Sequence, residues 1–273
     1  SYGFVYGLFF ALLAYNFMLF VGLKNSTYLY YAIYLSLFLL ANISYTGHGY
    51  EWLWSNYPSW QLRLNPLLMF CFSTSGLLFA SKFLNLKTAF PYIYRIVING
   101  CILFWVLLTL AILSNNHLIS LLLAFTFMFL FSGTMVMLGI ISLRAGNRSA
   151  IFFLLAAISA IVGTAITTAS VWGIIPINPL MFRAAEIGMM LDAILLALAL
   201  TNQFQIAQQE KNQAVLMARI DPLTNLNNRR AFYELVTPIW ETGLRNNRGI
   251  SLITLDIDKF KAINDTYGHG HGD

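Results

Sequence analysis

The stretch that decides the fold is Leu118–Leu143, which reads LISLLLAFTFMFLFSGTMVMLGIISL and contains no charged residue. A helix needs about 20 apolar residues to cross the hydrocarbon core of a bilayer, so this block is long enough to span a membrane. The whole chain is 58% hydrophobic and 10% charged, with a mean hydropathy of +0.68. Soluble domains carry about a quarter charged residues, so most of this chain is expected to face lipid.

Six other apolar blocks have a comparable length and also predict membrane spans. They are Tyr2–Leu23, Tyr28–Gly47, Leu62–Phe83, Tyr94–Ser114, Ala150–Ile174 and Leu180–Phe204. We therefore expect an all-α bundle of seven transmembrane helices over residues 1–205. The first block lacks a basic leader and is followed by six more spans, which disfavours a signal peptide. The chain begins at a helix edge without Met, so we expect a further part upstream.

The loop charges predict the orientation of these helices. Basic residues gather in the first, third and fifth loops, namely Lys24, Lys82, Lys87, Arg95, Arg144 and Arg148. The positive-inside rule therefore places these loops and the C-terminus in the cytoplasm, and the N-terminus outside. The net charge of +5 follows mainly from this topology, so no nucleic-acid partner is expected. The two cysteines lie inside predicted spans, where neither a disulfide nor a metal framework is expected.

Three ionisable residues lie in the seventh predicted span. Arg183 and Glu186 are three residues apart, a spacing that allows a pair on one helix face near the outer boundary. Asp192 lies about 13 Å further along the helix axis, near the middle of the bilayer. An intramembrane carboxyl group is costly and is a candidate signalling residue. A structural role, in which these groups fix the helix register, remains open for all three.

The polar stretch after the seventh span predicts a continuation of that helix. Residues 206–220 contain good helix formers and neither Gly nor Pro, and Pro222 then ends the pattern. A thin coiled-coil seam is formed by Phe204, Ala207, Lys211, Ala214 and Ala218. We interpret residues 206–220 as a cytoplasmic signalling helix that transmits motion, while a plain solvated spacer remains an alternative.

The last part of the chain, residues 221–273, has a different composition and carries the chemistry. Residues 251–257 are rich in Ile and Leu and predict a buried strand. Two carboxylates at alternate positions, Asp256 and Asp258, follow at its end, and a short amphipathic helix begins directly afterwards. A strand that ends in carboxylates beside a helix start is suited to holding Mg²⁺ and a nucleotide phosphate.

Two motifs in this region resemble the GGDEF domain, the diguanylate cyclase catalytic domain. The opening segment is DPLTNLNNRR at 221–230, and the second motif is DIDKFKAINDTYGHGHGD at 256–273. Asn225 stands where the family usually has Gly, and Asn is the non-Gly residue that best tolerates a positive φ. The resemblance implies the N-terminal part of an α+β, nucleotide-cyclase-like fold over residues 221–273.

The same resemblance implies a role for individual residues. The Asp256 carboxylate and the Ile257 carbonyl would bind Mg²⁺ on the phosphates of GTP. The amide of Phe260 and the side chain of Lys261 would lie near these phosphates, although a solvated lysine remains an equal alternative. Asn264 and Asp273 would hydrogen-bond the edge of the guanine base. The GGDEF signature itself would follow Asp273, so the catalytic residues are expected outside this stretch, and the stretch alone is expected to be inactive.

The membrane part resembles the bacterial seven-transmembrane receptors with diverse intracellular signalling modules. The resemblance rests on Tyr15-Asn16, on Tyr28-Leu29-Tyr30-Tyr31 and on the segment from Gly47 to Trp54. It implies a multi-pass protein of the bacterial inner membrane with an extracellular sensor upstream and a ligand that the sequence does not identify. The cytoplasmic output would condense two GTP into cyclic di-GMP and pyrophosphate in a homodimer.

Two other functions remain open at this stage. The first is a non-enzymatic receptor whose degenerate GGDEF domain only binds GTP or a partner protein. The second is a transporter, since polar residues occur within the spans. A transporter is disfavoured by the odd number of helices and by the lack of paired, Gly/Pro-interrupted helices.

Overall fold

The fold was obtained from a computed structural model, which describes residues 2–52, 55, 58–176, 178–217, 219–221, 223–268 and 270. The chain divides into two units, Ser1–Gln203 and Phe204–Asp273. The helices of the first unit are α1 (Tyr2–Leu23), α2 (Ser26–Tyr45), α3 (His48–Trp52), α4 (Pro58–Phe83), α5 (Leu86–Ala89), α6 (Pro91–Leu113), α7 (His117–Arg144), α8 (Ala150–Val171), α9 (Pro179–Phe182) and the first part of α10 (Ala184–Met217). The helices that lie wholly in the second unit are α11 (Arg229–Arg245) and α12 (Phe260–Tyr267).

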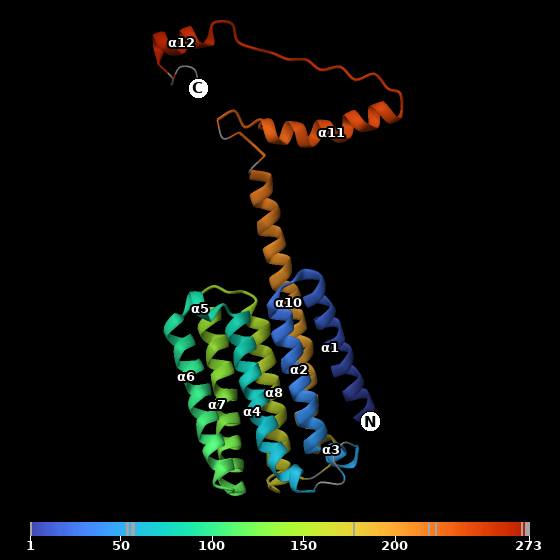
Figure 1. The fold of residues 1–273 in the computed structure, drawn as a ribbon, viewed down its shortest axis with the longest axis vertical. Helices are drawn as coiled ribbons and strands as arrows, with labels where there is room; N and C mark the ends of the chain where they lie inside the picture. Colours follow the sequence, from blue (N-terminus) through green and yellow to red (C-terminus); the bar gives the residue numbers. More distant parts are fainter. Residues whose placement is uncertain are drawn as a thin grey trace. The chain divides into compact units, whose positions relative to one another are not determined.

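The prediction of seven transmembrane helices is confirmed. Seven described helices, α1, α2, α4, α6, α7, α8 and α10, are long and apolar enough to cross a membrane (Figure 1). Asparagine side chains begin two of them, because each accepts a hydrogen bond from a backbone N–H of the first turn. Asn25 accepts from the Thr27 amide at 3.0 Å, and Asn116 accepts from the Ile119 amide at 3.2 Å. Short connections join α1 to α2, α6 to α7 and α7 to α8, and each of these pairs packs together.

The boundary of the seventh span differs from the prediction. The sequence predicts one helix from Leu180, whereas the structure has the short helix α9 and begins α10 only at Ala184. Pro179 opens α9, and the Asn178 side chain caps it by accepting from the Met181 amide at 2.8 Å. From Ala184, α10 continues without interruption to Met217, as the lack of Gly and Pro in the polar stretch predicts.

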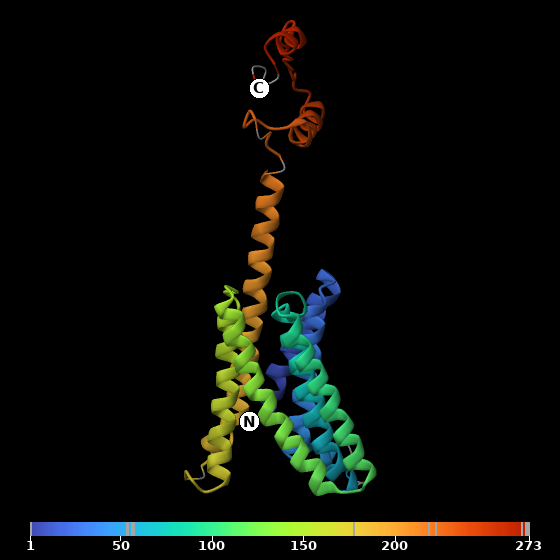
Figure 2. The same cartoon turned by 90° about the vertical axis from the view of Figure 1, so that its left-hand side faces the viewer.

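The bundle core is built mainly from aromatic rings on α2, α4 and α7. Helix α1 contacts α2, α2 contacts α4, and α4 contacts α7. Helix α7 also contacts α6 and α8, and Figure 2 shows it in light green as it runs toward the yellow helix α8. The Tyr34 ring stacks on Phe72 with centroids 5.1 Å apart, and Phe70 packs against Phe127 at 4.9 Å. Many apolar side chains on the outer surfaces stay exposed, such as Phe129 at 79%. Exposed apolar side chains on the outer surface are expected of helices that face lipid.

The second unit contains no sheet among its described residues. Two helices, α11 and α12, are joined by an extended segment, and an isolated antiparallel bridge pairs Ile220 with Asn227. The strand predicted over 251–257 is therefore not formed. A strand satisfies its backbone N–H and C=O groups only beside another strand, and the described residues place none along this segment.

Candidate functional site

Asp192 lies at the centre of a contact between α2 and α10. Its side chain is 1% exposed, and its Oδ2 accepts a hydrogen bond from the Tyr34 hydroxyl at 3.1 Å. One turn away on α2, the Tyr31 hydroxyl donates to the Ala193 carbonyl at 2.5 Å. Both tyrosines are buried against Phe79. Two phenols of α2 therefore hold the middle of α10 at a defined height and rotation.

Arg183 and Glu186 do not pair, although their spacing allows it. Arg183 is the residue between α9 and α10, and its guanidinium lies over the Tyr2 ring at 4.1 Å from the centroid. Glu186 is 9% exposed, and no ion pair joins it to Arg183. The break between the two helices gives Arg183 φ −98 and ψ 7, which departs from helical geometry and turns it toward α1 instead.

A close contact between α8 and α10 was not anticipated from the sequence. A Cβ on Gly163 would lie 2.4 Å from the Ala184 carbonyl oxygen, and one on Gly188 would lie 2.6 Å from the Ser159 carbonyl oxygen. The Ser159 hydroxyl also reaches the Gly188 carbonyl at 3.2 Å. The signal is visible in retrospect, because each helix carries two small residues four positions apart. Such pairs let helix backbones approach closely in membranes.

In the second unit, the Asp221 side chain accepts several hydrogen bonds from residues 223 and 224. The Asp221 carboxylate accepts from the Thr224 amide at 2.9 Å, from the Thr224 hydroxyl at 3.0 Å and from the Leu223 amide at 3.2 Å. These hydrogen bonds lower the pKa of Asp221, and those from Thr224 have the largest effect. Asn225 has φ +58, so the expectation that Asn here replaces Gly in a left-handed turn is confirmed.

Charged residues join this turn to α11. Arg219 and Arg230 both contact the Glu234 carboxylate, with N–O distances of 3.0 Å in each case. The hydrogen bonds from Arg230 and Arg219 lower the pKa of Glu234. The Asn228 side chain caps α11 by accepting from the Ala231 amide at 3.0 Å. The opening motif of this unit is thus locally ordered by its own side chains.

The residues expected to bind Mg²⁺ lie just before α12 and are exposed. The Asp256 carboxylate accepts from the Ile257 amide at 3.0 Å. The Ile257 carbonyl accepts from the Phe260 amide at 3.3 Å, within the turn that starts α12. Lys259 occupies this turn with φ +59. The Phe260 amide therefore donates within the chain, and a phosphate would compete with that contact.

Lys261 and Asn264 lie three residues apart on α12, whereas Asp273 lies outside the described residues. Lys261 is exposed. The Asn264 Oδ1 atom is buried and has no hydrogen-bond partner among the residues that the structure describes. Burying an amide oxygen without a hydrogen bond costs free energy, so this oxygen can accept a hydrogen bond from a ligand. Guanine offers such N–H donors.

Oxygen ligands of the kind that Mg²⁺ prefers are present at this position. The Asp256 carboxylate and the Ile257 carbonyl are adjacent oxygen donors, and both residues are exposed. In the described part of the chain, no three His, Cys, Asp or Glu side chains gather into a metal site. A site here would thus hold the ion with few protein ligands and with phosphate oxygens, which is the usual arrangement for Mg²⁺.

Comparison with known families supports both of the resemblances that the sequence predicts, one for the membrane part and one for the C-terminal part. Residues 1–203 match the family model described as 7TM diverse intracellular signalling. Residues 218–273 match the model described as diguanylate cyclase, GGDEF domain. No solved structure matches the chain significantly.

Curated relatives each match a part of this chain. The chain is 43% identical over 75 residues to the cyclic di-GMP phosphodiesterase NbdA of Pseudomonas aeruginosa, covering 28% of this chain and 9% of that protein. It is 36% identical over 91 residues to the diguanylate cyclase DgcP of Escherichia coli, covering 33% and 27%. It is 40% identical over 58 residues to the diguanylate cyclase DgcS of Shewanella oneidensis, covering 21% and 20%. The chain thus spans less than a third of the length of these relatives.

Proposed function

The chain belongs to the 7TM diverse intracellular signalling family, and we propose that it is a bacterial inner-membrane receptor whose output is the synthesis of cyclic di-GMP. The observation that carries the proposal is the presence of both matches in one chain, a seven-helix membrane domain followed by a GGDEF segment. At the family level this makes it a multi-pass membrane protein of cyclic di-GMP signalling with a diguanylate cyclase domain.

We propose three functional parts. Residues 1–205 are the receptor domain, residues 206–220 are the signalling helix, and residues 221–273 are the N-terminal portion of the GGDEF domain. The N-terminus lies outside the cell with an extracellular sensor, and the C-terminus lies in the cytoplasm, where GTP is found. The support for this orientation is the concentration of Lys and Arg in alternate loops.

In the proposed nucleotide site, each residue has a chemical task. Asp256 and the Ile257 carbonyl hold Mg²⁺, which neutralises phosphate charge when it is bound. Lys261 and the Phe260 amide contact the phosphates. Asn264 and Asp273 read the guanine edge, and the unsatisfied Asn264 Oδ1 supports this assignment. The exposure of Asp256 leaves its oxygens accessible to an incoming nucleotide.

The proposed reaction needs two copies of the chain, each presenting one GTP to the other. The 3′-hydroxyl of each nucleotide attacks the α-phosphate of its partner, so that two phosphodiester bonds form and two pyrophosphates leave. Positioning supplies most of the catalysis in such transfers. The GGDEF signature does not occur in the 273 residues, and we propose that these residues alone do not turn over GTP.

A second function is a receptor whose GGDEF domain binds GTP or a partner without cyclising it. One observation favours it: a relative that is 43% identical over 75 residues is named a cyclic di-GMP phosphodiesterase. Proteins of both named activities are therefore similar to part of this chain.

The test compares cyclic di-GMP synthesis by the full-length protein and by Asp256→Ala in membranes supplied with GTP and Mg²⁺. Loss of a metal ligand is expected to reduce the rate by about 100-fold or more. Glu241→Ala, which removes an exposed carboxylate of α11, is the matched control and should leave the rate unchanged. Equal synthesis by wild type and Asp256→Ala would overturn the metal role. GTP binding without any synthesis by the wild type would favour the second function.

A further inference from the structure

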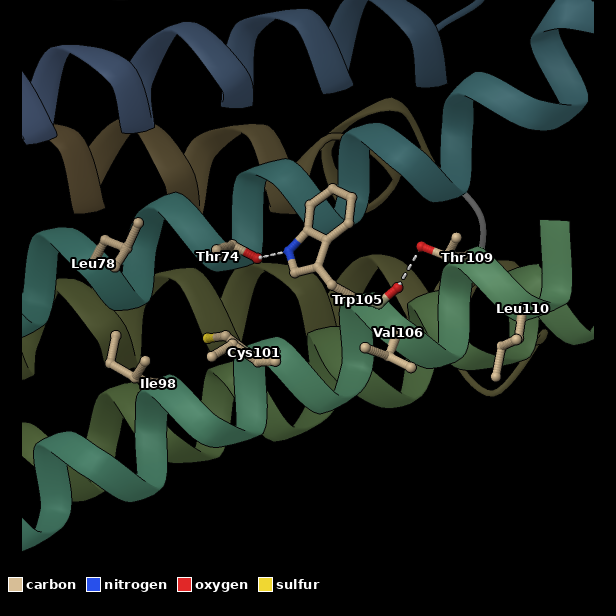
Figure 3. Close-up of a pocket in the computed structure, with 9 residues that line it drawn as sticks. Thr74, Leu78, Ile98, Cys101, Trp105, Val106, Thr109 and Leu110 are labelled. Carbon is tan, nitrogen blue, oxygen red and sulfur yellow. Dashed lines mark hydrogen bonds between the residues drawn. The ribbon is translucent and has the colours of Figure 1, made fainter. Parts of the chain in front are cut away.

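A long apolar hollow opens on the bundle between α4 and α6. Both helices lean on α7 and contact each other less closely, which leaves an open space of about 520 Å³. Figure 3 shows its walls, with Thr74 and Leu78 on α4 and a row of α6 side chains that includes Ile98, Trp105 and Leu110. The Trp105 indole N–H donates to the Thr74 hydroxyl at 2.9 Å, so the polar atoms of both side chains are already paired.

The shape and chemistry of this hollow fit an alkyl chain. The α6 wall extends from Ile98 to Leu110, which is about 18 Å at the helical rise. One leaflet of the hydrocarbon core is about 15 Å thick, so the hollow is about as long as a lipid tail. Ile102 and Leu110, which line it, are 57% and 58% exposed. An apolar surface of this length within a membrane offers a ligand only dispersion contacts and no hydrogen bonds.

Cations lie just beyond one end of the hollow on both walls. Figure 3 places Leu78 and Ile98 at the same end. Lys82 follows Leu78 by four residues on α4, and Arg95 precedes Ile98 by three on α6, so each cation continues the lining face of its helix. Lys87 lies on α5, the short helix that connects the two walls.

These cations have no carboxylate partners within the described residues. All three residues are exposed. The ion pairs found in the described residues join only Arg219 and Arg230 to Glu234. Basic pockets between transmembrane helices bind the headgroups of anionic lipids, and a negative phosphate also favours the first turn of a helix such as α6. The end of the hollow therefore has an unmatched positive charge.

We propose that the hollow between α4 and α6 is a binding site for an anionic phospholipid of the membrane. One acyl chain lies along Ile98, Ile102 and Leu110, and the phosphate contacts Lys82 and Arg95. Occupancy joins α4 to α6 by filling the space that their side chains leave open. The site is built from residues of the first unit and does not depend on the proposed cyclase function.

Trp105 in the wall of the hollow provides a direct test. The full-length protein is reconstituted into a series of vesicles in which an increasing mole fraction of the lipid carries brominated chains, either on phosphatidylglycerol or on phosphatidylcholine. The Trp105 signal is the difference in fluorescence between wild type and Trp105→Phe. We expect brominated phosphatidylglycerol to quench this signal at a lower mole fraction than brominated phosphatidylcholine. The preference should fall about fivefold for each cation removed in Lys82→Gln and Arg95→Gln.

Lys24→Gln is the matched control, because it removes an exposed cation from the α1–α2 connection, and it should keep the preference. Equal quenching by both lipids in the wild type would overturn the proposal, since it would show ordinary lipid contact only. A preference that persists in the Lys82→Gln/Arg95→Gln protein would also overturn it. Disulfide crosslinking of Ile102→Cys between two chains, with Cys71 and Cys101 replaced by Ser, would place a second copy in the hollow instead and would equally overturn it.

Discussion

Two carboxyl groups of this chain, Asp192 and Asp256, have opposite surroundings. Asp192 is buried and is bound by Tyr34, a residue 158 positions earlier in the sequence. Asp256 is exposed and accepts from the amide of its own neighbour. In the membrane unit, a residue far away in the sequence thus fixes the Asp192 side chain. In the second unit, the contacts of the site residues are local, so their final positions depend on what binds them.

The strongest test of this contrast is to separate α8 from α10. Gly188→Leu would drive a side chain into the Ser159 backbone, which no rotamer change can avoid. We expect a loss of stability above about 3 kcal/mol and little folded protein. Gly100→Leu is the control, because a Cβ there meets nothing within 4 Å. Thermal unfolding in detergent would measure both, and an unchanged midpoint for Gly188→Leu would contradict the close packing.

A smaller effect is expected from the hydrogen bond between α2 and α10. Tyr34→Phe removes the donor to Asp192 while keeping the ring in its aromatic stack. Side-chain hydrogen bonds between membrane helices contribute about 0.6 kcal/mol on average, with a maximum near about 1.7 kcal/mol. A double-mutant cycle with Asp192→Asn, measured by unfolding, should give a coupling in this range. Additive effects would show that the two groups act independently.

The same two variants separate a structural from a signalling role for Asp192. A structural role predicts that Asp192→Asn lowers stability but keeps the response of the full-length receptor to its signal. A role that requires the ionisable group predicts loss of the response at normal stability. Measuring cyclic di-GMP synthesis with and without signal therefore discriminates between the two interpretations.

The smallest expected effect is a pH response of the second unit. The pKa of Glu234 is lowered by Arg230 and Arg219, so the ionised form stabilises the contact between the turn and α11. This stabilisation is present above the ordinary value of 4.5 and is lost as pH falls through the lowered pKa. The protection factors of residues 219–234 against hydrogen exchange should therefore fall over that acidic range. In Glu234→Gln these protection factors should be low already and should not change with pH there.

The sequence predicted the membrane unit well because a helix in lipid satisfies its own backbone hydrogen bonds. Apolar length alone therefore located the seven spans, whose boundaries shifted by a few residues in most cases. The break before Ala184 was missed because Leu180–Phe182 is as apolar as the helix that follows. The contact of Gly163 with Gly188 was missed because small residues have no hydropathy signal, only a spacing.

The sequence motif predicted which residues form the candidate nucleotide site, but it did not predict how these residues are arranged in space. Asn225 could be assigned a positive φ from its residue type, since few other side chains adopt it. The apolar pattern before Asp256 could not decide whether a strand forms, because a strand also needs a neighbouring strand for its backbone hydrogen bonds. The spacing of Arg183 and Glu186 allows a pair, but Arg183 lies over the Tyr2 ring, since the pairing rule assumes an unbroken helix.

Helix α10 runs without a break from Ala184 to Met217. A helix has an angular phase as well as a length, and each residue adds about 100° of rotation and about 1.5 Å of advance. One residue inserted after Gln203 would therefore rotate every later residue of α10 by about 100° around the helix axis. Seven inserted residues would restore the original direction to within about 20°. The number of residues between Gln203 and Met217 therefore sets the rotational phase of the last part of α10.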